Sequence, residues 1–176
     1  SIKTSEYDSK VEFSTIHNDA NDLFSLYYIL DMGTDNDLEM GLAVEYLPYL
    51  GTADMTAEEL QKELFKLGVS FDVFTGRDRM YVVLTGLNES FDAGVALFEN
   101  VLANAAPNEQ AYNDMVAGKL KKRQDAMKSK GQILNRAMAQ YAKYGENTPM
   151  KNIISAADLT DIDPNTLVDK IKSITS

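Results

Sequence analysis

The pattern of hydrophobic and polar positions predicts two β-strands near the start of the chain. In KVEFSTI, residues 10–16, apolar and polar residues alternate roughly with period two, as they do on the two faces of a strand. LFSLYYIL, residues 23–30, is a longer run rich in the aromatic and β-branched residues that strands favour. The polar segment HNDAND separates the two predicted strands as a turn.

A helix is predicted next, over residues 36–50. In NDLE, Asn36 can cap the helix and Glu39 can reach back to the backbone of the cap, which is a capping box. Pro48 weakens the helix near its end, because proline lacks the amide hydrogen that a helix interior needs. The segment is apolar on nearly every side, so we expect it to be buried on more than one side.

A second helix and a β-hairpin follow. TAEE forms another capping box, with Thr56 and Glu59, and Gly68 is a left-handed stop for this helix. The period of the pattern then returns to two. VSFDVFT, residues 69–75, and RMYVVLT, residues 79–85, are joined by GRD and predict a β-hairpin.

The rest of the chain is predicted to be helical. Asn88 can cap a helix with an apolar stripe, which consists of Phe91, Val95, Phe98 and Leu102. After Pro107 two more helices are predicted, split near Gly131. Their apolar sides are marked by Tyr112, Met115, Val116 and Leu120 in the first and by Leu134, Met138 and Tyr141 in the second. Asp163 caps a last short helix, which starts with Pro164.

The predicted order is β-β-α-α-β-β-α-α-α with a short final helix. Regular βαβ alternation is absent, which favours an antiparallel sheet with helices packed on one face, an α+β two-layer domain. The chain has 176 residues, of which 44% are hydrophobic and 25% charged. This length and composition fit one globular domain over residues 1–176.

Composition excludes several kinds of site. The chain has no cysteine, which excludes disulfides, cysteine metal sites and thiol catalysis and is compatible with both cytoplasm and periplasm. His17 is the single histidine, so a site that needs two imidazoles cannot be built from this chain, and its polar turn predicts a surface position. No apolar run is long enough to span a membrane. The predicted hairpin turn carries three charged residues, Arg77, Asp78 and Arg79. We interpret them as ordinary turn charges; the alternative is a site that binds an anionic substrate.

The charge of the chain is unevenly distributed. Its formal net charge is −10, but residues 111–145 hold eight Lys/Arg against Asp114 and Asp125, a local balance of 8 − 2 = +6, so the rest sums to −16. An acidic body argues against nucleic acid as the main partner. The basic run KLKKRQDAMKSK, residues 119–130, reads as the solvated face of a helix or as a docking surface for an acidic partner domain.

One carboxylate lies in the middle of the apolar stretch GLAVEYLPYLGT, residues 41–52. Leu42, Glu45 and Tyr46 share one side of the predicted helix because residues three and four apart are neighbours on a helix. The structural interpretation of this pattern is that Leu42 and Tyr46 simply pack in the core, and that Glu45 is a partly exposed carboxylate with a hydrogen bond to a neighbouring group.

This stretch resembles the zinc-binding helix of the insulinase/pitrilysin family of zinc peptidases, which includes the mitochondrial processing peptidases. The family's mark is H-x-x-E-H on a helix that runs into Gly-Thr, with two imidazoles on the zinc and the glutamate as general base. Placed from Gly51 and Thr52, Glu45 matches the glutamate, whereas Leu42 and Tyr46 stand at the histidine positions. The family's third ligand, a glutamate on a later helix, has no counterpart, because no Glu occurs between residues 109 and 146.

The resemblance extends over about residues 10–173. Residues 55–102, from MTAEEL to FENVL, resemble the family's helix, glycine, hairpin and long helix in the same order, and YAKYGENTP resembles a later segment. The resemblance implies a bacterial-type, non-catalytic unit of a zinc metalloendopeptidase, with a degenerate site at Leu42, Glu45 and Tyr46 and with no catalytic residue, metal or cofactor of its own. The zinc is expected in a sister domain of the parent hydrolase.

The same resemblance implies partners and function. Such a unit walls the chamber for proteolysis and helps to bind unfolded peptide, and its partners are the other domains of the peptidase. The alternative is a stand-alone scaffold or interaction subunit on the same fold. In the family a further strand follows the short helix that starts at Asp163, whereas this sequence stops there. We therefore expect a fragment of a longer protein, with the final strand of its sheet missing and an open sheet edge.

Overall fold

The computed structural model describes residues 3–7, 11–148 and 151–174. Its strands are β1 (Lys3–Tyr7), β2 (Val11–Thr15), β3 (Leu23–Leu30), β4 (Gly51–Thr52), β5 (Ser70–Thr75), β6 (Met80–Leu87) and β7 (Ala105–Ala106). Its α-helices are α1 (Leu38–Tyr46), α2 (Ala57–Lys66), α3 (Phe91–Asn104), α4 (Glu109–Lys128), α5 (Lys130–Tyr144), α6 (Ala156–Asp161) and α7 (Pro164–Ser173). Short 3-10 turns are η1 (Leu47–Tyr49), η2 (Asn88–Ser90) and η3 (Gly145–Asn147).

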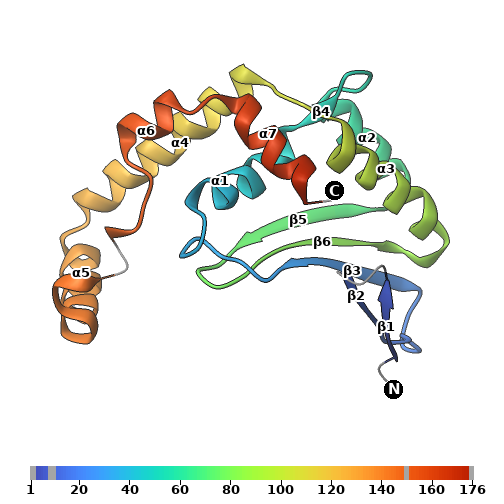
Figure 1. The fold of residues 1–176 in the computed structure, drawn as a ribbon, viewed down its shortest axis with the longest axis horizontal. Coiled ribbons are helices and arrows are strands. Elements are labelled where there is room, and N and C mark those ends of the chain that lie inside the picture. The colour runs from blue at the N-terminus through green and yellow to red at the C-terminus, as the bar shows by residue number, and fades with distance from the viewer. Residues whose placement is uncertain (1–2, 8–10, 149–150, 175–176) are drawn as a thin grey trace.

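The centre of the fold is an antiparallel sheet with the strand order β3-β6-β5. Side chains alternate along each strand, so that Leu26 of β3 and Leu84 of β6 face the helices while their neighbours face outward. Figure 1 shows the helices α1, α2, α3 and α7 on one side of this sheet. The predicted α+β architecture, an antiparallel sheet with helices on one face, is confirmed.

Helix α1 runs through the middle of the core. Every residue from Met40 to Tyr46 except Glu45 is buried, which agrees with the prediction from its all-round apolar sequence. The helix packs on α7, where Leu167 and Ile171 are buried, and on β5. At its start, Lys170 of α7 donates to the carboxylate of Asp37 at 2.7 Å, which ties the two helices together.

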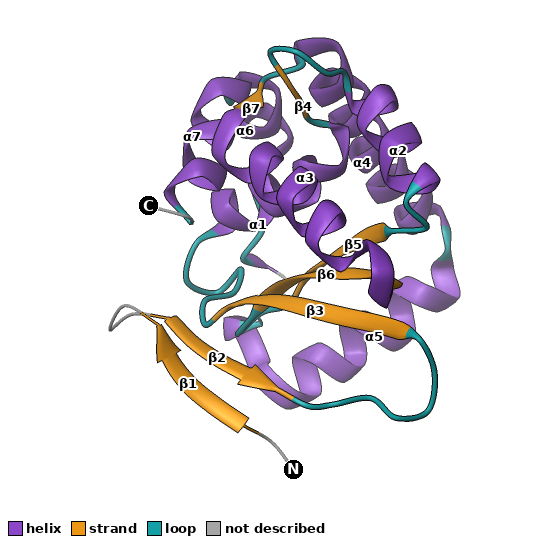
Figure 2. Cartoon of the chain, turned by 90° about the vertical axis from the view of Figure 1, so that its right-hand side faces the viewer, coloured by secondary structure: helices purple, strands orange, loops and turns teal. Residues whose placement is uncertain are grey.

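The N-terminal hairpin stands apart from the main sheet. Strand β1 pairs with β2 in a separate two-stranded sheet, and Figure 2 shows this hairpin beside β3 without joining it. The strand predicted over residues 10–16 is present as β2, although its first residue lies outside the described residues. Strand β1 was not predicted, nor was α6.

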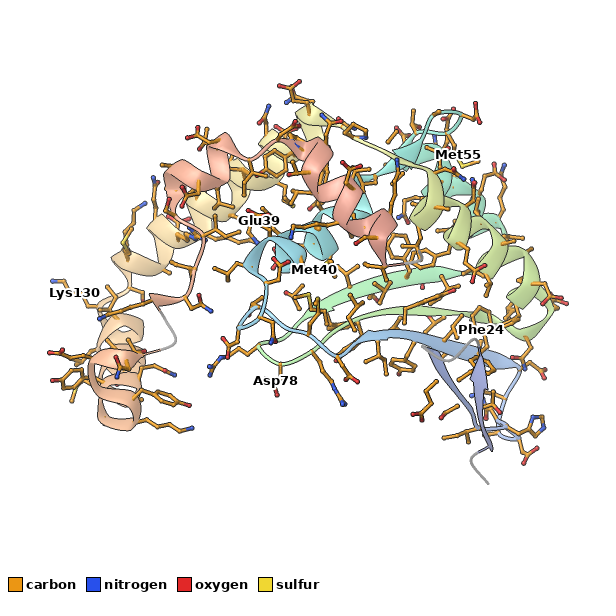
Figure 3. The ribbon with its side chains drawn as sticks, in the orientation of Figure 1. Phe24, Glu39, Met40, Met55, Asp78 and Lys130 are labelled. Carbon is orange, nitrogen blue, oxygen red and sulfur yellow. The ribbon has the colours of Figure 1, made fainter. Side chains whose placement is uncertain are left out.

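Most of the local predictions are confirmed. The side chains of Thr56 and Glu59 form the capping box of α2, and Gly68 takes a left-handed conformation with φ of 62° after its end. The hairpin β5–β6 lies where the pattern placed it, with Asp78 labelled at its turn in Figure 3. Helices α4 and α5 are split at Ser129, and Asp163 caps α7 with its carboxylate.

Two predicted caps are wrong. Asp37, not Asn36, caps α1, because it accepts from the amide of Met40 at 2.9 Å. The side chain of Asn36 instead accepts from the amide of Gly33 and closes the preceding turn. Asn88 begins the 3-10 turn η2 and does not cap α3, which starts three residues later.

Candidate functional site

The three residues of the degenerate motif lie where α1 meets α4 and the sheet. The side chain of Leu42 is 3% exposed and that of Tyr46 is 0% exposed, which confirms the predicted burial of both. Helix α1 continues into η1 and then into β4, which pairs with β7 through Gly51 and Thr52. The motif is therefore anchored at both ends of the segment that carries it.

Tyr46 connects α1 to the start of α4. Its hydroxyl donates to the carbonyl oxygen of Asn108 at 2.7 Å and accepts from the Asn108 amide at 2.8 Å. Its ring meets that of Tyr112 edge to face, with 5.5 Å between the ring centroids. Burial raises the pKa of the Tyr46 phenol, and the hydrogen bond to Asn108 offsets only part of this rise. The phenol is therefore protonated near neutral pH, and its hydroxyl is engaged by the backbone of Asn108.

Glu45 points away from this core and toward α4 and β5. One carboxylate oxygen accepts from the ammonium group of Lys119, and the other accepts from the Thr75 hydroxyl at 3.1 Å. The side chains of Glu45 and Lys119 are 36% and 28% exposed, so the ion pair is partly shielded from water. Glu45 is therefore the hydrogen-bonded, partly exposed carboxylate of the structural interpretation, and it lies against β5.

The donors around this position do not fit a zinc ion. Leu42 offers only carbon, the Tyr46 hydroxyl is engaged with the backbone of Asn108, and Glu45 already has the positive charge of Lys119 as its partner. Zinc needs three or four nitrogen, sulfur or oxygen ligands around one point. No group of three or more His, Cys, Asp and Glu that could hold a metal occurs among the residues that the structure describes.

A cleft of about 700 Å³ opens beside the Glu45–Lys119 pair. Three elements line it. The α1–η1 segment contributes Glu45, Pro48 and Tyr49, β5 contributes Val73, and α4 contributes Asp114, Met115, Gly118, Lys119 and Lys122. The lining is mixed: apolar surface is available from Tyr49, Val73 and Met115, and both signs of charge occur at the rim. Such a cleft suits a chain with both apolar and polar groups.

The other charged candidates are engaged in local contacts. His17 is exposed and lies 3.0 Å from a carboxylate oxygen of Asp19. Arg77 forms an ion pair with Asp35 at 2.6 Å, and Arg79 forms one with Asp31 at 2.7 Å. These pairs join the turn of the hairpin to the segment before α1, so the interpretation as turn charges is supported over an anion clamp.

Sequence reasoning missed the partners of the motif. Thr75 was assigned only to a strand, Lys119 was read as part of a solvated basic run, and Asn108 was not singled out. Each lies at least 30 residues from its partner in sequence. No local spacing signals such contacts, because the packing of α1 against β5 and beside α4 creates them.

Comparisons with known proteins agree with this geometry. A family model described as insulinase (peptidase family M16) matches residues 32–155. No curated protein matches the sequence. Among the helices in the described ranges, none has the length and apolar character needed to cross a bilayer.

Several solved structures share the fold. The periplasmic protease PqqL from Escherichia coli aligns with a TM-score of 0.79 at 6% identity over 99% of this chain and 20% of that chain. The inactive domain of a peptidase M16 from Pseudomonas fluorescens aligns with a TM-score of 0.72 at 14% identity, over 98% of this chain and 50% of that chain. A mutant of the ferredoxin protease FusC in complex with Arabidopsis ferredoxin aligns with a TM-score of 0.70 at 15% identity, over 99% of this chain and 21% of that chain. This chain thus spans between a fifth and a half of the structures it matches.

Proposed function

Because this chain belongs to the insulinase family of peptidases, family M16, we propose that it is a non-catalytic unit of a zinc metalloendopeptidase. The observation that carries the proposal is the environment of Glu45. The residue at the general-base position of this zinc-dependent family is paired with Lys119, and carbon and a buried phenol replace the two imidazoles. A glutamate in this setting has no activated water to deprotonate.

The role we propose is architectural and peptide-binding. Residues 1–176 form one unit that walls a peptide-degradation chamber together with other units of the same polypeptide, one of which carries the zinc. Its cleft between α1, β5 and α4 would contact unfolded peptide through Tyr49, Val73 and Met115. The match to the M16 inactive domain, and the partial coverage of the longer solved proteases, support this division of labour. The ferredoxin bound in the FusC mutant structure supports protein binding by a protease that contains this fold.

Zinc binding and cleavage test the non-catalytic part. After incubation with zinc and removal of free metal, we expect far less than one zinc per chain, and the same amount in the variant Glu45→Gln. Glu39→Gln, on the exposed side of the same helix, is the matched control. Stoichiometric zinc that is lost in Glu45→Gln alone, or chelator-sensitive cleavage of an unstructured peptide by the purified chain, would overturn the proposal.

Peptide affinity tests the binding part. Fluorescence anisotropy with a labelled, unstructured peptide should show binding that Tyr49→Ala and Met115→Ala weaken. Phe65→Ala is the control, because Phe65 is 84% exposed on α2 and does not line the cleft. A chain that binds no peptide would instead favour the alternative, a scaffold subunit on the same fold.

A further inference from the structure

Helix α5 carries an apolar stripe that the chain leaves uncovered. Leu134, Met138 and Tyr141 follow the spacing i, i+4 and i+7 and are 59%, 62% and 65% exposed. The apolar side predicted from the sequence is therefore present, but it is not part of the core. Figure 1 shows α5 at the far end of α4, away from the sheet. Exposed apolar residues that lie together on one face are a feature of interaction sites.

The outer face of the central sheet is a second uncovered apolar surface. Tyr27, Ile29 and Phe74 point outward from the sheet and are 55%, 59% and 46% exposed. Tyr81 lies between them on β6, with its ring stacked on that of Phe74 at 4.9 Å between centroids. Val83 extends the patch along β6. In the described part of the chain, the helices cover only the opposite face, and the β1–β2 hairpin lies below one end of the sheet (Figure 1).

The two surfaces match in size. A helix of 15 residues such as α5 is about 22 Å long. Strands β3 and β6 have eight residues each, and such a strand is about 26 Å long. Three strands spaced about 4.8 Å apart give a face about 10 Å wide, which is close to the diameter of a helix. A helix can therefore cover this face, as helices cover the other one.

The charges of the two surfaces are also complementary. Residues 111–145, which include α5, have a balance of +6, whereas the remainder of the chain sums to −16. Lys130 is exposed and lies one turn before Leu134 (Figure 3), so it is on the same side of α5 as the apolar stripe. Asp72 is exposed on the outer face of the sheet, in register with Val83. Helix α5 has three basic residues and no acidic one, and the sheet face carries the carboxylate of Asp72, so the charges favour contact between these two surfaces, whereas two α5 helices would repel each other.

We propose that α5 of one copy packs with its apolar stripe on the outer face of the sheet of a second copy. The chain holds its own α5 away from its own sheet, because Lys119 ties α4 to α1 and the guanidinium of Arg123 donates to the carbonyl of Ile154 at 2.8 Å. The contact is therefore head to tail, with different surfaces on the two copies. Such a contact can add further copies at each end.

Two kinds of variant separate the two surfaces. Met138→Asp places a charge in the stripe of α5, and Phe74→Lys places a positive charge on the sheet face that would repel the basic helix. Both positions are exposed, so the core is unchanged, and urea unfolding verifies the fold of each variant. Tyr27→Asp is a second face variant if Phe74→Lys fails to fold. Phe65→Asp, on exposed α2, is the control outside both surfaces.

Sedimentation velocity from micromolar to millimolar protein is the measurement. The wild type and Phe65→Asp should grow in mass with concentration, less so at high salt. Met138→Asp and Phe74→Lys should each remain monomeric alone. An equimolar mixture of the two should form a dimer and no larger species, because one retains a sheet face and the other retains a stripe. A wild type that is monomeric throughout, a single variant that assembles like the wild type, or a mixture that does not dimerise would overturn the proposal.

Discussion

Replacing Tyr46 with phenylalanine tests whether this position now holds the fold together. The substitution keeps the ring, which is 0% exposed, and removes a hydroxyl that makes two hydrogen bonds to the backbone of Asn108. A buried backbone group that loses its partner costs about 1–3 kcal/mol. Because the Asn108 side chain is exposed, water can reach part of this site, so we expect a total loss of about 1–3 kcal/mol rather than twice that.

Urea unfolding, followed by far-UV circular dichroism, measures this loss as a lower midpoint with an unchanged slope. Tyr49→Phe is the matched control, because Tyr49 lies three residues further on and is 44% exposed. The control should unfold like the wild type. A loss below about half a kcal/mol in Tyr46→Phe would show that the hydroxyl contributes less than one ordinary hydrogen bond, and the structural role assigned to Tyr46 would be wrong.

Three further substitutions probe the same region. Leu42→Ala should cost about 2–5 kcal/mol of unfolding free energy in the same assay, as for other buried leucines, and a change near zero would contradict the burial of α1. Lys119→Met keeps the aliphatic stem but leaves Glu45 without its cation. We expect a loss of roughly 1 kcal/mol, at the upper end of the values for exposed pairs because this pair is partly shielded, and Glu45→Gln in the same chain should partly restore it. For Asp37, burial would raise the pKa, but the hydrogen bonds from Lys170 and Met40 outweigh it and lower the pKa. The stabilisation from this carboxylate is therefore present above its unfolded pKa of about 3.9 and is lost as the pH falls through the folded value, so wild type and Asp37→Asn should converge in urea midpoint on acidification.

The parts of the fold that were predictable depend on neighbours in sequence. The capping box of Thr56 and Glu59 and the stop at Gly68 are contacts within a few residues, and the structure forms them as predicted. The alternation in residues 69–85 specifies the two faces of a hairpin in the same way. The predicted cap of α1 was wrong by one residue. Two adjacent polar residues can cap the helix there, and the side chain of Asn36 accepts a hydrogen bond from the amide of Gly33 in the preceding turn instead.

The parts that were not predictable depend on how distant elements pack. The pattern of α5 correctly gave an apolar side, but periodicity cannot tell whether another element covers it, and here none in the described chain does. Likewise, Lys119 belongs to a basic run that was interpreted as a solvated helix face or as a docking surface, and only the position of α4 beside α1 brings it to Glu45. The resemblance to the family identified Glu45 as the residue at the glutamate position of the motif. Its partner Lys119 could be found only from the three-dimensional structure.

The environment of Glu45 determines which changes a zinc site at this position would require. A carboxylate that is about two-thirds shielded from water needs a positive partner, and Lys119 provides that charge in this chain. Leu42→His would place an imidazole at a position that is 3% exposed, among apolar side chains. Tyr46→His would break both hydrogen bonds to Asn108. Two new histidines would therefore still meet a lysine ammonium that repels a divalent cation, and a zinc site would require a further change at Lys119. Building a zinc site at these positions would therefore remove contacts that Leu42, Glu45 and Tyr46 make in the packed fold.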